Sequence, residues 1–210
     1  MREYHKIHSI FKREQKTNQF IFGDWARPEF GYLANNLWVF TEKVDGTNIR
    51  VHWDGATRIF GGRTESAQIP ATLIKRLEEL FPVEKFKDLP PLMLCGEGYG
   101  AKIQSGGNYK QTQDFVLFDV LVDKWWLERE NVVDIASKLG LDVVPIVGEG
   151  TIQEAIDFVR NGFNSTWGSF IAEGLVIRPK VELFARDGSR VITKIKHKDF
   201  KMPVATAASS

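Results

Sequence analysis

A lysine stands at position 43 in the stretch TEKVDGTNIRV, just before Asp45-Gly46. A neutral lysine amine can attack phosphorus, but an ordinary lysine, with a pKa near 10.4, is protonated at neutral pH. The same stretch also fits a plain turn, because Asp-Gly commonly ends a strand. Most lysines are exposed, so the turn alone would favour a solvated side chain at Lys43.

Two further lysines, Lys194 and Lys196, alternate in the stretch RVITKIK. A strand there would direct both side chains to one face. If that face meets Lys43, the two positive charges would lower the pKa of its amine and would neutralise phosphate groups. A reaction of Lys43 should then speed up with pH and level off below the pKa of free lysine. Both lysines also fit a solvated strand face.

Other side chains could bind a phosphorylated nucleotide. Arg63 follows two glycines, and its guanidinium suits bidentate phosphate binding, although a surface ion pair with Glu65 is the alternative. Phe118 could pack in a core or stack on a base. Glu97 and Glu173 stand beside glycines, where their carboxylates could bind a hard divalent cation or face solvent.

Hydrophobic periodicity predicts the elements that position these residues. Strands are expected at 37–43, 48–53, 56–61, 91–97, 114–122, 173–179, 181–186 and 190–196, and helices at 71–81, 131–140 and 151–162. Asp54-Gly55 predicts a two-residue hairpin turn, and 148–150 a loop before a helix. Strand alternation would turn Asp119 away from Phe118. Antiparallel hairpins with few helices favour an α+β fold of two packed layers.

The stretch FTEKVDGTNIRV resembles the nucleotidyl-lysine motif of the covalent nucleotidyltransferases, the superfamily of ATP-dependent ligases and mRNA capping enzymes. The other motifs of that superfamily follow in the expected order as GGRT, CGEGYG, VLFDVLV, EGLVIRP and ITKIKHK. EGLVIRP, KIK and GYGAKIQSGGNY are most similar to the ATP-dependent RNA ligases of the phage and RNA-editing type. The matches extend from Glu42 to Lys196, which is most of the chain.

The resemblance implies a nucleotidyltransferase fold, an ATP-grasp-like ligase adenylation domain with two mostly antiparallel sheets, flanking helices and a central nucleotide cleft. It implies that the catalytic residues are Lys43, Lys194 and Lys196. It implies that the ATP-binding residues are Glu42, Asn48, Arg63, Glu97, Phe118, Glu173, Lys194 and Lys196. Glu173 would also hold Mg²⁺ or Mn²⁺, Glu97 would contact the ribose, Phe118 would stack on adenine, and Arg50 would line the site.

The resemblance also implies an activity in three steps. Lys43 attacks the α-phosphorus of ATP and becomes lysyl-AMP, AMP passes to a 5′-phosphate, and a 3′-hydroxyl displaces AMP to seal the strand. The expected partner is a nucleic acid with those ends, and RNA is favoured. The alternatives are a DNA ligase, a GTP-using capping-type enzyme, or a non-catalytic nucleic-acid-binding relative, which would not need all of the motif lysines and glutamates.

Length, charge and cysteine content bear on the number of domains, the partners and the location of the protein. The length of 210 residues predicts one domain over 1–200 and a frayed tail at 201–210. The resemblance implies that this domain is an adenylation domain, with no OB-fold or helical C-terminal domain. A net charge of +1 gives no global attraction to nucleic acid or lipid. The single cysteine, Cys95, fits a reducing compartment. The absence of a signal peptide and of a long apolar run predicts a cytoplasmic protein without a membrane partner.

Overall fold

The computed structural model describes residues 2–200, which form two compact units. Unit 1 contains residues 2–6, 44–146 and 165–170, and unit 2 contains residues 7–43, 147–164 and 171–200. The chain therefore passes from unit 2 to unit 1 directly after Lys43. That one adenylation domain spans 1–200 stays a prediction, and the predicted tail lies outside the described residues.

Unit 1 is built on a five-stranded antiparallel sheet in the order β6-β5-β7-β8-β9. Its strands are β5 (Thr47–Trp53), β6 (Arg58–Gly62), β7 (Leu92–Tyr99), β8 (Asp114–Val122) and β9 (Trp125–Trp126). Ile49, Val51 and Trp53 are buried in the main core of the unit. Because strand side chains alternate, Asn48 and Arg50 take the opposite face of the sheet.

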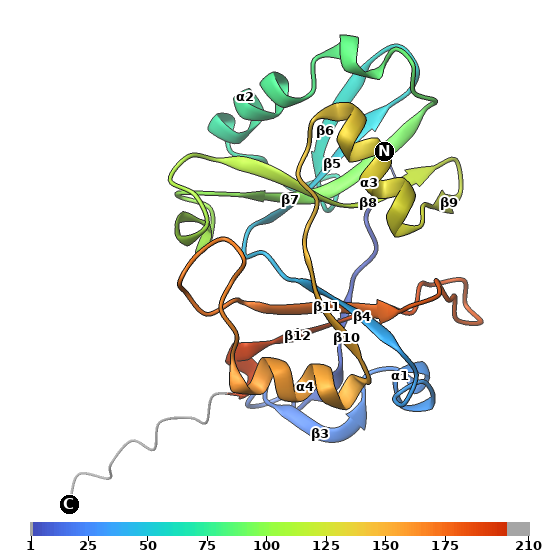
Figure 1. The fold of residues 1–210 in the computed structure, drawn as a ribbon, viewed down its shortest axis with the longest axis vertical. Coiled ribbons are helices and arrows are strands. Elements are labelled where there is room, and N and C mark those ends of the chain that lie inside the picture. Colours follow the sequence, from blue (N-terminus) through green and yellow to red (C-terminus); the bar gives the residue numbers. More distant parts are fainter. Residues whose placement is uncertain (1, 201–210) are drawn as a thin grey trace, which may run out of the picture. The chain divides into compact units, whose positions relative to one another are not determined.

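The helices of unit 1 cover the apolar face of this sheet, as Figure 1 shows for α2 and α3. They are α2 (Ala71–Leu80), α3 (Arg129–Leu139) and the short 3-10 helix η1 (Val83–Phe86). A further 3-10 helix, η2 (Gly106–Asn108), lies between β7 and β8 in the chain. Leu73 and Leu77 of α2 are fully buried against the sheet. Helix α3 ends at Gly140, whose φ of 68° is the left-handed conformation that commonly terminates helices.

Unit 2 contains a second five-stranded sheet, in the order β1-β12-β11-β4-β10, and a two-stranded sheet of β2 and β3. The strands are β1 (His8–Ser9), β2 (Phe11–Arg13), β3 (Phe20–Trp25), β4 (Trp38–Glu42), β10 (Ile146–Gly150), β11 (Gly174–Pro179) and β12 (Thr193–Lys196). The helices are α1 (Pro28–Tyr32), α4 (Ile152–Asn161) and the 3-10 helix η3 (His197–Phe200). Helix α4 lies along the sheet of unit 2 (Figure 1). Its Ile156 and Val159 pack in the core that contains Leu175 and Ile195.

Most predicted elements are present, and the α+β fold is confirmed. The predicted capping box opens α4, where the side chain of Thr151 and that of Glu154 each accept a hydrogen bond from the other residue's backbone. The predicted strand at 181–186 is wrong, because only a single bridge joins Phe184 to Arg190 there. Residues 148–150 belong to β10 rather than to a loop. Among residues 2–200, no helix is long and apolar enough to cross a membrane.

The predicted two-residue hairpin turn between β5 and β6 is also wrong, since the connection spans Asp54–Thr57. The carboxylate of Asp54 accepts hydrogen bonds from the backbone amides of Ala56 and Thr57. These bonds lower the pKa of Asp54 to about 2. The side chain thereby organises a longer turn than the Asp-Gly pair alone would give.

Candidate active site

Lys43 lies directly after the last residue of β4, as the sequence predicts. Its backbone amide donates a hydrogen bond to the carbonyl of Gly174 at 2.9 Å. The backbone amide of His197, the residue after β12, donates a hydrogen bond to the carbonyl of Glu173 at 2.9 Å. The ends of β4, β11 and β12 are therefore joined at one place, and the side chains of Lys43 and Glu173 start from a fixed backbone.

One carboxylate lies between two lysines at this place. Glu173 Oε2 is 2.6 Å from Lys43 Nζ, and Glu173 Oε1 is 2.6 Å from Lys196 Nζ. The three side chains are only 11–22% exposed, so water screens these ion pairs little. The sequence places Lys194 and Lys196 on one strand face that could meet Lys43, but it does not predict that Glu173 holds Lys43 and Lys196 together.

Gly174 allows this close approach. Its φ is +152°, and a Cβ at this position would lie 2.0 Å from the carbonyl oxygen of Ile195. Only glycine fits so close to a neighbouring backbone. The glycine beside Glu173 therefore has a structural cause, which is the register of Gly174 with Lys196 across β11 and β12.

Lys194 and Glu42 complete the candidate residues of unit 2. Lys194 and Lys196 are half-buried and alternate with the fully buried Thr193 and Ile195, so both lysines take one face of β12, as predicted. Glu42 pairs with Leu175 across β4 and β11, and its side chain is 1% exposed. Unit 2 thus brings Lys43, Glu173 and Lys196 into direct contact, with Lys194 on the adjoining strand position of the same face.

Unit 1 carries a second group of candidate residues. Asn48 of β5 pairs directly with Glu97 of β7, so the two side chains share one face of the sheet. The Oδ1 atom of Asn48 is buried and accepts no hydrogen bond from the described residues. A Cβ on Gly46 would lie 2.3 Å from the carbonyl oxygen of Gly98 and 2.9 Å from Glu97 Cγ. Gly46 therefore lets the turn after Lys43 pass close to Glu97.

Arg63 follows the last residue of edge strand β6, and its side chain is exposed. It forms no ion pair with any of residues 2–200. The surface pair with Glu65 that the sequence offered as an alternative is absent there, because Glu65 instead pairs with Arg50 at 3.7 Å. The guanidinium of Arg63 is thus accessible to a phosphate.

Phe118 lies at a bulge in β8. Cys95 pairs with Asp119 and Gly96 pairs with Leu117, so Phe118 is the extra residue. Tyr4 contacts both Phe118 and Asp119. Its hydroxyl donates to Asp119 Oδ2 at 2.5 Å, and its ring centroid is 5.3 Å from that of Phe118. The prediction that Asp119 faces away from Phe118 is therefore wrong, because the bulge interrupts the alternation.

An aromatic cluster in unit 1 supports the turn after Lys43. The cluster consists of Val44, Tyr99, Tyr109, Val116 and Val144, with Phe118, Trp167 and Phe170 packed against it. The hydroxyl of Tyr109 accepts a hydrogen bond from the Asp45 amide at 3.2 Å, and Asp45 Oδ2 accepts one from the Ser105 amide at 3.3 Å. Burial in the cluster raises the pKa of Tyr99. No local pattern in the sequence predicts these long-range contacts.

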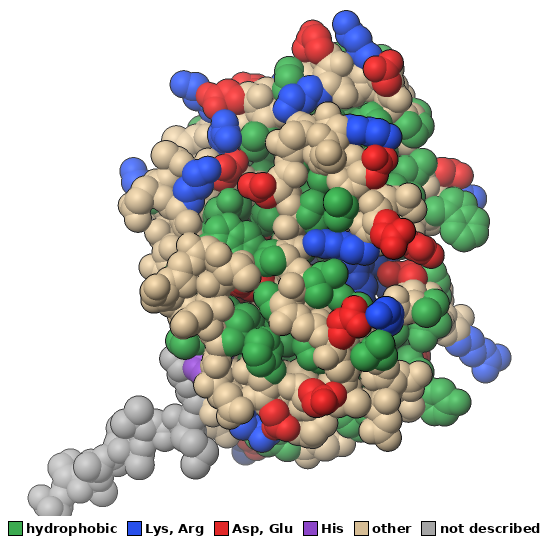
Figure 2. Space-filling view, viewed as in Figure 1, with side chains coloured by type: hydrophobic (Ala, Val, Ile, Leu, Met, Phe, Trp, Pro, Cys, Tyr) green, Lys and Arg blue, Asp and Glu red, His purple; other side chains and the backbone are tan. Residues whose placement is uncertain are grey.

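The acidic residues of the described chain can be considered as ligands of a metal ion. Among the described residues, no three His, Cys, Asp or Glu side chains are close enough to form a complete metal site. A Mg²⁺ ion often takes only one or two carboxylates and completes its shell with substrate phosphates and water, so Glu173 fits that mode. On the face drawn in Figure 2, basic and acidic side chains are interspersed, which agrees with the absence of a global positive field.

The RNA ligase family model matches residues 36–196, a span that includes every candidate residue named above. This chain belongs to the RNA ligase family. A comparison of this RNA ligase family member with curated proteins gave no match.

Solved structures of the Naegleria gruberi RNA ligase are similar to this family member. A variant with ATP and Mn gives a TM-score of 0.67 at 19% identity, and the similarity covers 94% of this chain and 58% of that chain. The structure with PPi gives a TM-score of 0.66 at 20% identity, and the similarity covers 94% of this chain and 62% of that chain. A variant with AMP and Mn gives 0.66 at 20% identity, covering 94% and 58%. The likeness shows an α+β fold of the nucleotidyltransferase ligase type, and the chain spans about three fifths of these proteins.

Proposed function

We propose that this chain is an ATP-dependent RNA ligase that forms a lysyl-AMP intermediate on Lys43. The observation that carries the proposal is the cluster of Lys43, Glu173 and Lys196, with both lysine nitrogens 2.6 Å from one carboxylate. The cluster lies within the span matched by the family model. The Naegleria gruberi structures with ATP, AMP and PPi give further support, because ATP is the substrate of lysine adenylylation, pyrophosphate is its leaving group and AMP is the group transferred to the lysine.

The first step would use the lone pair of Lys43 Nζ. It forms a bond to the α-phosphorus of ATP while the bond to the pyrophosphate oxygen breaks, so lysyl-AMP and pyrophosphate result. An ammonium has no lone pair, so the amine must first lose a proton. Glu173 Oε2, at 2.6 Å, is within reach of that proton.

The remaining charged groups would hold the triphosphate. Lys194 and Lys196 would stabilise the negative charge that develops during attack, and Arg63 would bind a phosphate through its exposed guanidinium. A Mg²⁺ or Mn²⁺ ion, held by Glu173 and the phosphates, would neutralise charge on the leaving group. Any such ion has to compete with two ammonium groups for the Glu173 carboxylate.

Other candidate residues would recognise the nucleoside. Glu42 would line the adenine pocket, Phe118 would stack on the base, Glu97 would contact the ribose, and Asn48 would supply its buried Oδ1 atom as an acceptor. The second and third steps would pass AMP to a 5′-phosphate and then join that end to a 3′-hydroxyl. The polynucleotide we propose is RNA, and the proposed location is cytoplasmic.

Incubation with α-labelled nucleotides and Mg²⁺ or Mn²⁺ tests the first step. We expect covalent label from ATP on the wild-type protein and none on Lys43→Ala. Lys180→Ala is the matched control, because Lys180 is also an ion-paired lysine of unit 2 but its side chain is 55% exposed. Label on Lys43→Ala would refute the nucleophile assignment, and label from GTP but not ATP would refute the ATP-dependent ligase in favour of a capping-type enzyme.

Sealing assays on nicked RNA, DNA and hybrid duplexes test the later steps. We expect ligated product from substrates in which a 5′-phosphate meets a 3′-hydroxyl of RNA. Sealing of DNA alone would show a DNA ligase instead. Adenylylation without any sealing would restrict the proposal to its first step, and a wild-type protein that takes no label would point to a non-catalytic relative.

A further inference from the structure

The first residues of the chain are attached to the sheet of unit 1, although residues 7–43 belong to unit 2. The attachment includes hydrogen bonds from Tyr4 Oη to Asp119 Oδ2 at 2.5 Å, from Arg50 Nη1 to the carbonyl of Arg2, and from the amide of Glu65 to Glu3 Oε1 at 3.1 Å. They reach β5, β8 and the segment after β6. Residues 2–6 therefore span the sheet on the face opposite its main core.

Two of these attachment points are buried charges. The side chains of Arg50 and Asp119 are 1% and 2% exposed. Arg50 pairs with Cys95 across β5 and β7, and Cys95 pairs with Asp119 across β7 and β8, so the two charges lie in one row. Removing a partner from a buried charge carries a large penalty, so residues 2–6 are firmly coupled to this row.

The adjoining row on the same face carries candidate nucleotide-binding residues. Asn48 pairs with Glu97 in that row, two residues along β5 from Arg50. Phe118 lies at the bulge next to Asp119, and the Tyr4 ring packs 5.3 Å from its ring. The extra residue of a bulge has no partner across the ladder, so cross-strand pairing does not fix the position of its side chain. Tyr4 gives support to the ring and to the neighbouring carboxylate together.

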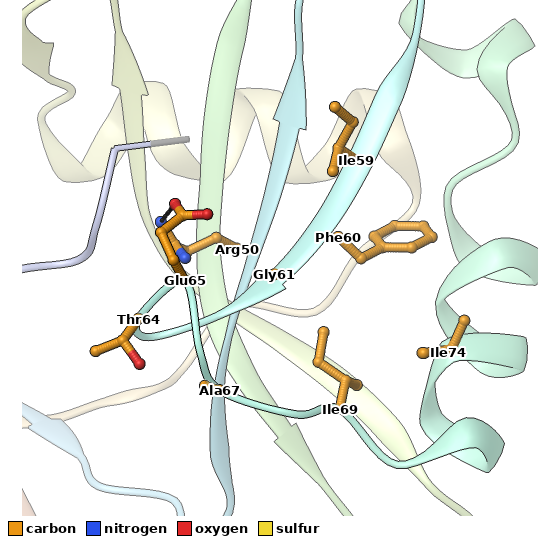
Figure 3. Close-up of a pocket in the computed structure, with 9 residues that line it drawn as sticks. All are labelled: Arg50, Ile59, Phe60, Gly61, Thr64, Glu65, Ala67, Ile69 and Ile74. Atoms are coloured by element: carbon orange, nitrogen blue, oxygen red, sulfur yellow. Dashed lines mark ion pairs between the residues drawn. The ribbon is translucent and has the colours of Figure 1, made fainter.

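The same attachment constrains Arg63. Arg50 Nε donates to the carbonyl of Gly62, and the Arg50 guanidinium pairs with Glu65, so one side chain holds the chain on both sides of Arg63. Figure 3 shows this ion pair at the edge of a cavity of about 430 Å³ beside β6. Because the Glu65 amide donates to Glu3 and the Arg50 guanidinium donates to the Arg2 carbonyl, residues 2–6 contact both Glu65 and Arg50.

We propose that residues 2–6 form a brace that holds Phe118 and Arg63 in the geometry that binds ATP, with Tyr4 as its positioning residue. The proposal rests on the adenylylation function proposed above. Tyr4 acts through Asp119 and Phe118 and takes no part in bond making. Loss of its hydroxyl should therefore weaken nucleotide binding more than it slows the chemical step.

The test compares Tyr4→Phe with wild type in an adenylylation assay at varied ATP concentration. We expect the KM for ATP to rise at least about tenfold, the change that loss of one hydrogen bond to a charged group gives, with kcat altered less than about twofold. Asp119→Asn combined with Tyr4→Phe should raise KM no further than the larger single effect, because both act through one bond. Tyr32→Phe is the control, since Tyr32 is 89% exposed in unit 2.

The outcomes separate the brace from the function it rests on. No label on wild type or Tyr32→Phe would refute the proposed function, whereas label on both with an unchanged KM in Tyr4→Phe would refute the brace. A fall in kcat of Tyr4→Phe with an unchanged KM for ATP would also overturn the brace. If Tyr4→Phe unfolds below the assay temperature, Glu3→Ala tests the same segment from its exposed end. A KM raised about twofold would support the brace, and an unchanged KM would refute it.

Discussion

Replacement of Glu173 by glutamine should reveal how strongly its carboxylate holds two lysines together. Each lysine nitrogen lies 2.6 Å from a different oxygen of that carboxylate, and the glutamate side chain is 11% exposed. A hydrogen bond between charged groups contributes roughly 1.5–3 kcal/mol. Glutamine keeps one acceptor oxygen but no charge, so we expect Glu173→Gln to lower the free energy of unfolding by about 3 kcal/mol.

The effect of removing Lys196 should depend on Glu173. In the wild-type protein, Lys196→Met loses one ion pair, and we expect a cost of about 1.5 kcal/mol. In the Glu173→Gln protein, the same change removes a like charge near Lys43 and should be neutral or stabilising. The double-mutant cycle should therefore give a coupling free energy of at least about 1 kcal/mol, measured by urea denaturation.

A surface pair supplies the control for this cycle. Lys180 pairs with Glu149 at 2.9 Å, but these side chains are 55% and 38% exposed. Lys180→Met should cost less than about 1 kcal/mol, and equally in the wild-type and Glu173→Gln proteins. If Lys196→Met costs the same in both proteins to within about 0.5 kcal/mol, Glu173 does not couple the lysines and the reasoning is refuted.

Two further changes test other parts of unit 1. Burial alone would raise the pKa of Asp114, but hydrogen bonds, first from Lys110, lower it below 3.8. Asp114→Asn should therefore cost about 2 kcal/mol in denaturation at pH 7, and the difference should vanish as the pH falls through that lowered pKa; a pH-independent difference would contradict this. Gly46→Ala should cost about 1–3 kcal/mol and reduce adenylylation, because its Cβ would collide with the Gly98 carbonyl. A Cβ on Gly107 would make only ordinary van der Waals contact, so Gly107→Ala should leave the free energy of unfolding and the adenylylation activity unchanged.

The sequence predicts the elements whose signals are local. The helix ending at Gly140 and the capping box at Thr151 need only neighbouring residues, and both are confirmed. The strand predicted at 181–186 fails because its apolar residues alternate without finding a partner strand, and only Phe184 makes a bridge. The short strands β1 to β3 carry weak alternation and were not predicted, since tertiary pairing decides them.

The sequence names the candidate residues of the site, but it does not give their geometry. The position of Lys43 at a strand end follows from its local pattern, and the structure confirms it. That Glu173 joins Lys43 to Lys196 depends on the register of three strands distant in sequence. The bulge at Phe118 is likewise invisible in an apolar run, because the extra residue is defined only by the partner strand.

The glycines beside the candidate residues have a geometric role that their motifs alone do not reveal. Gly-rich stretches often suggest backbone amides that cradle phosphates. Here a Cβ on Gly174 would lie 2.0 Å from the Ile195 carbonyl, and one on Gly46 would lie 2.3 Å from the Gly98 carbonyl. Both glycines are required because strands or turns pass close to one another: Gly174 lets β11 approach β12 beside Glu173 and Lys196, and Gly46 lets the turn after Lys43 pass close to Glu97. A substitution at either glycine should therefore disturb the position of the lysine and carboxylate before it alters any contact with phosphate.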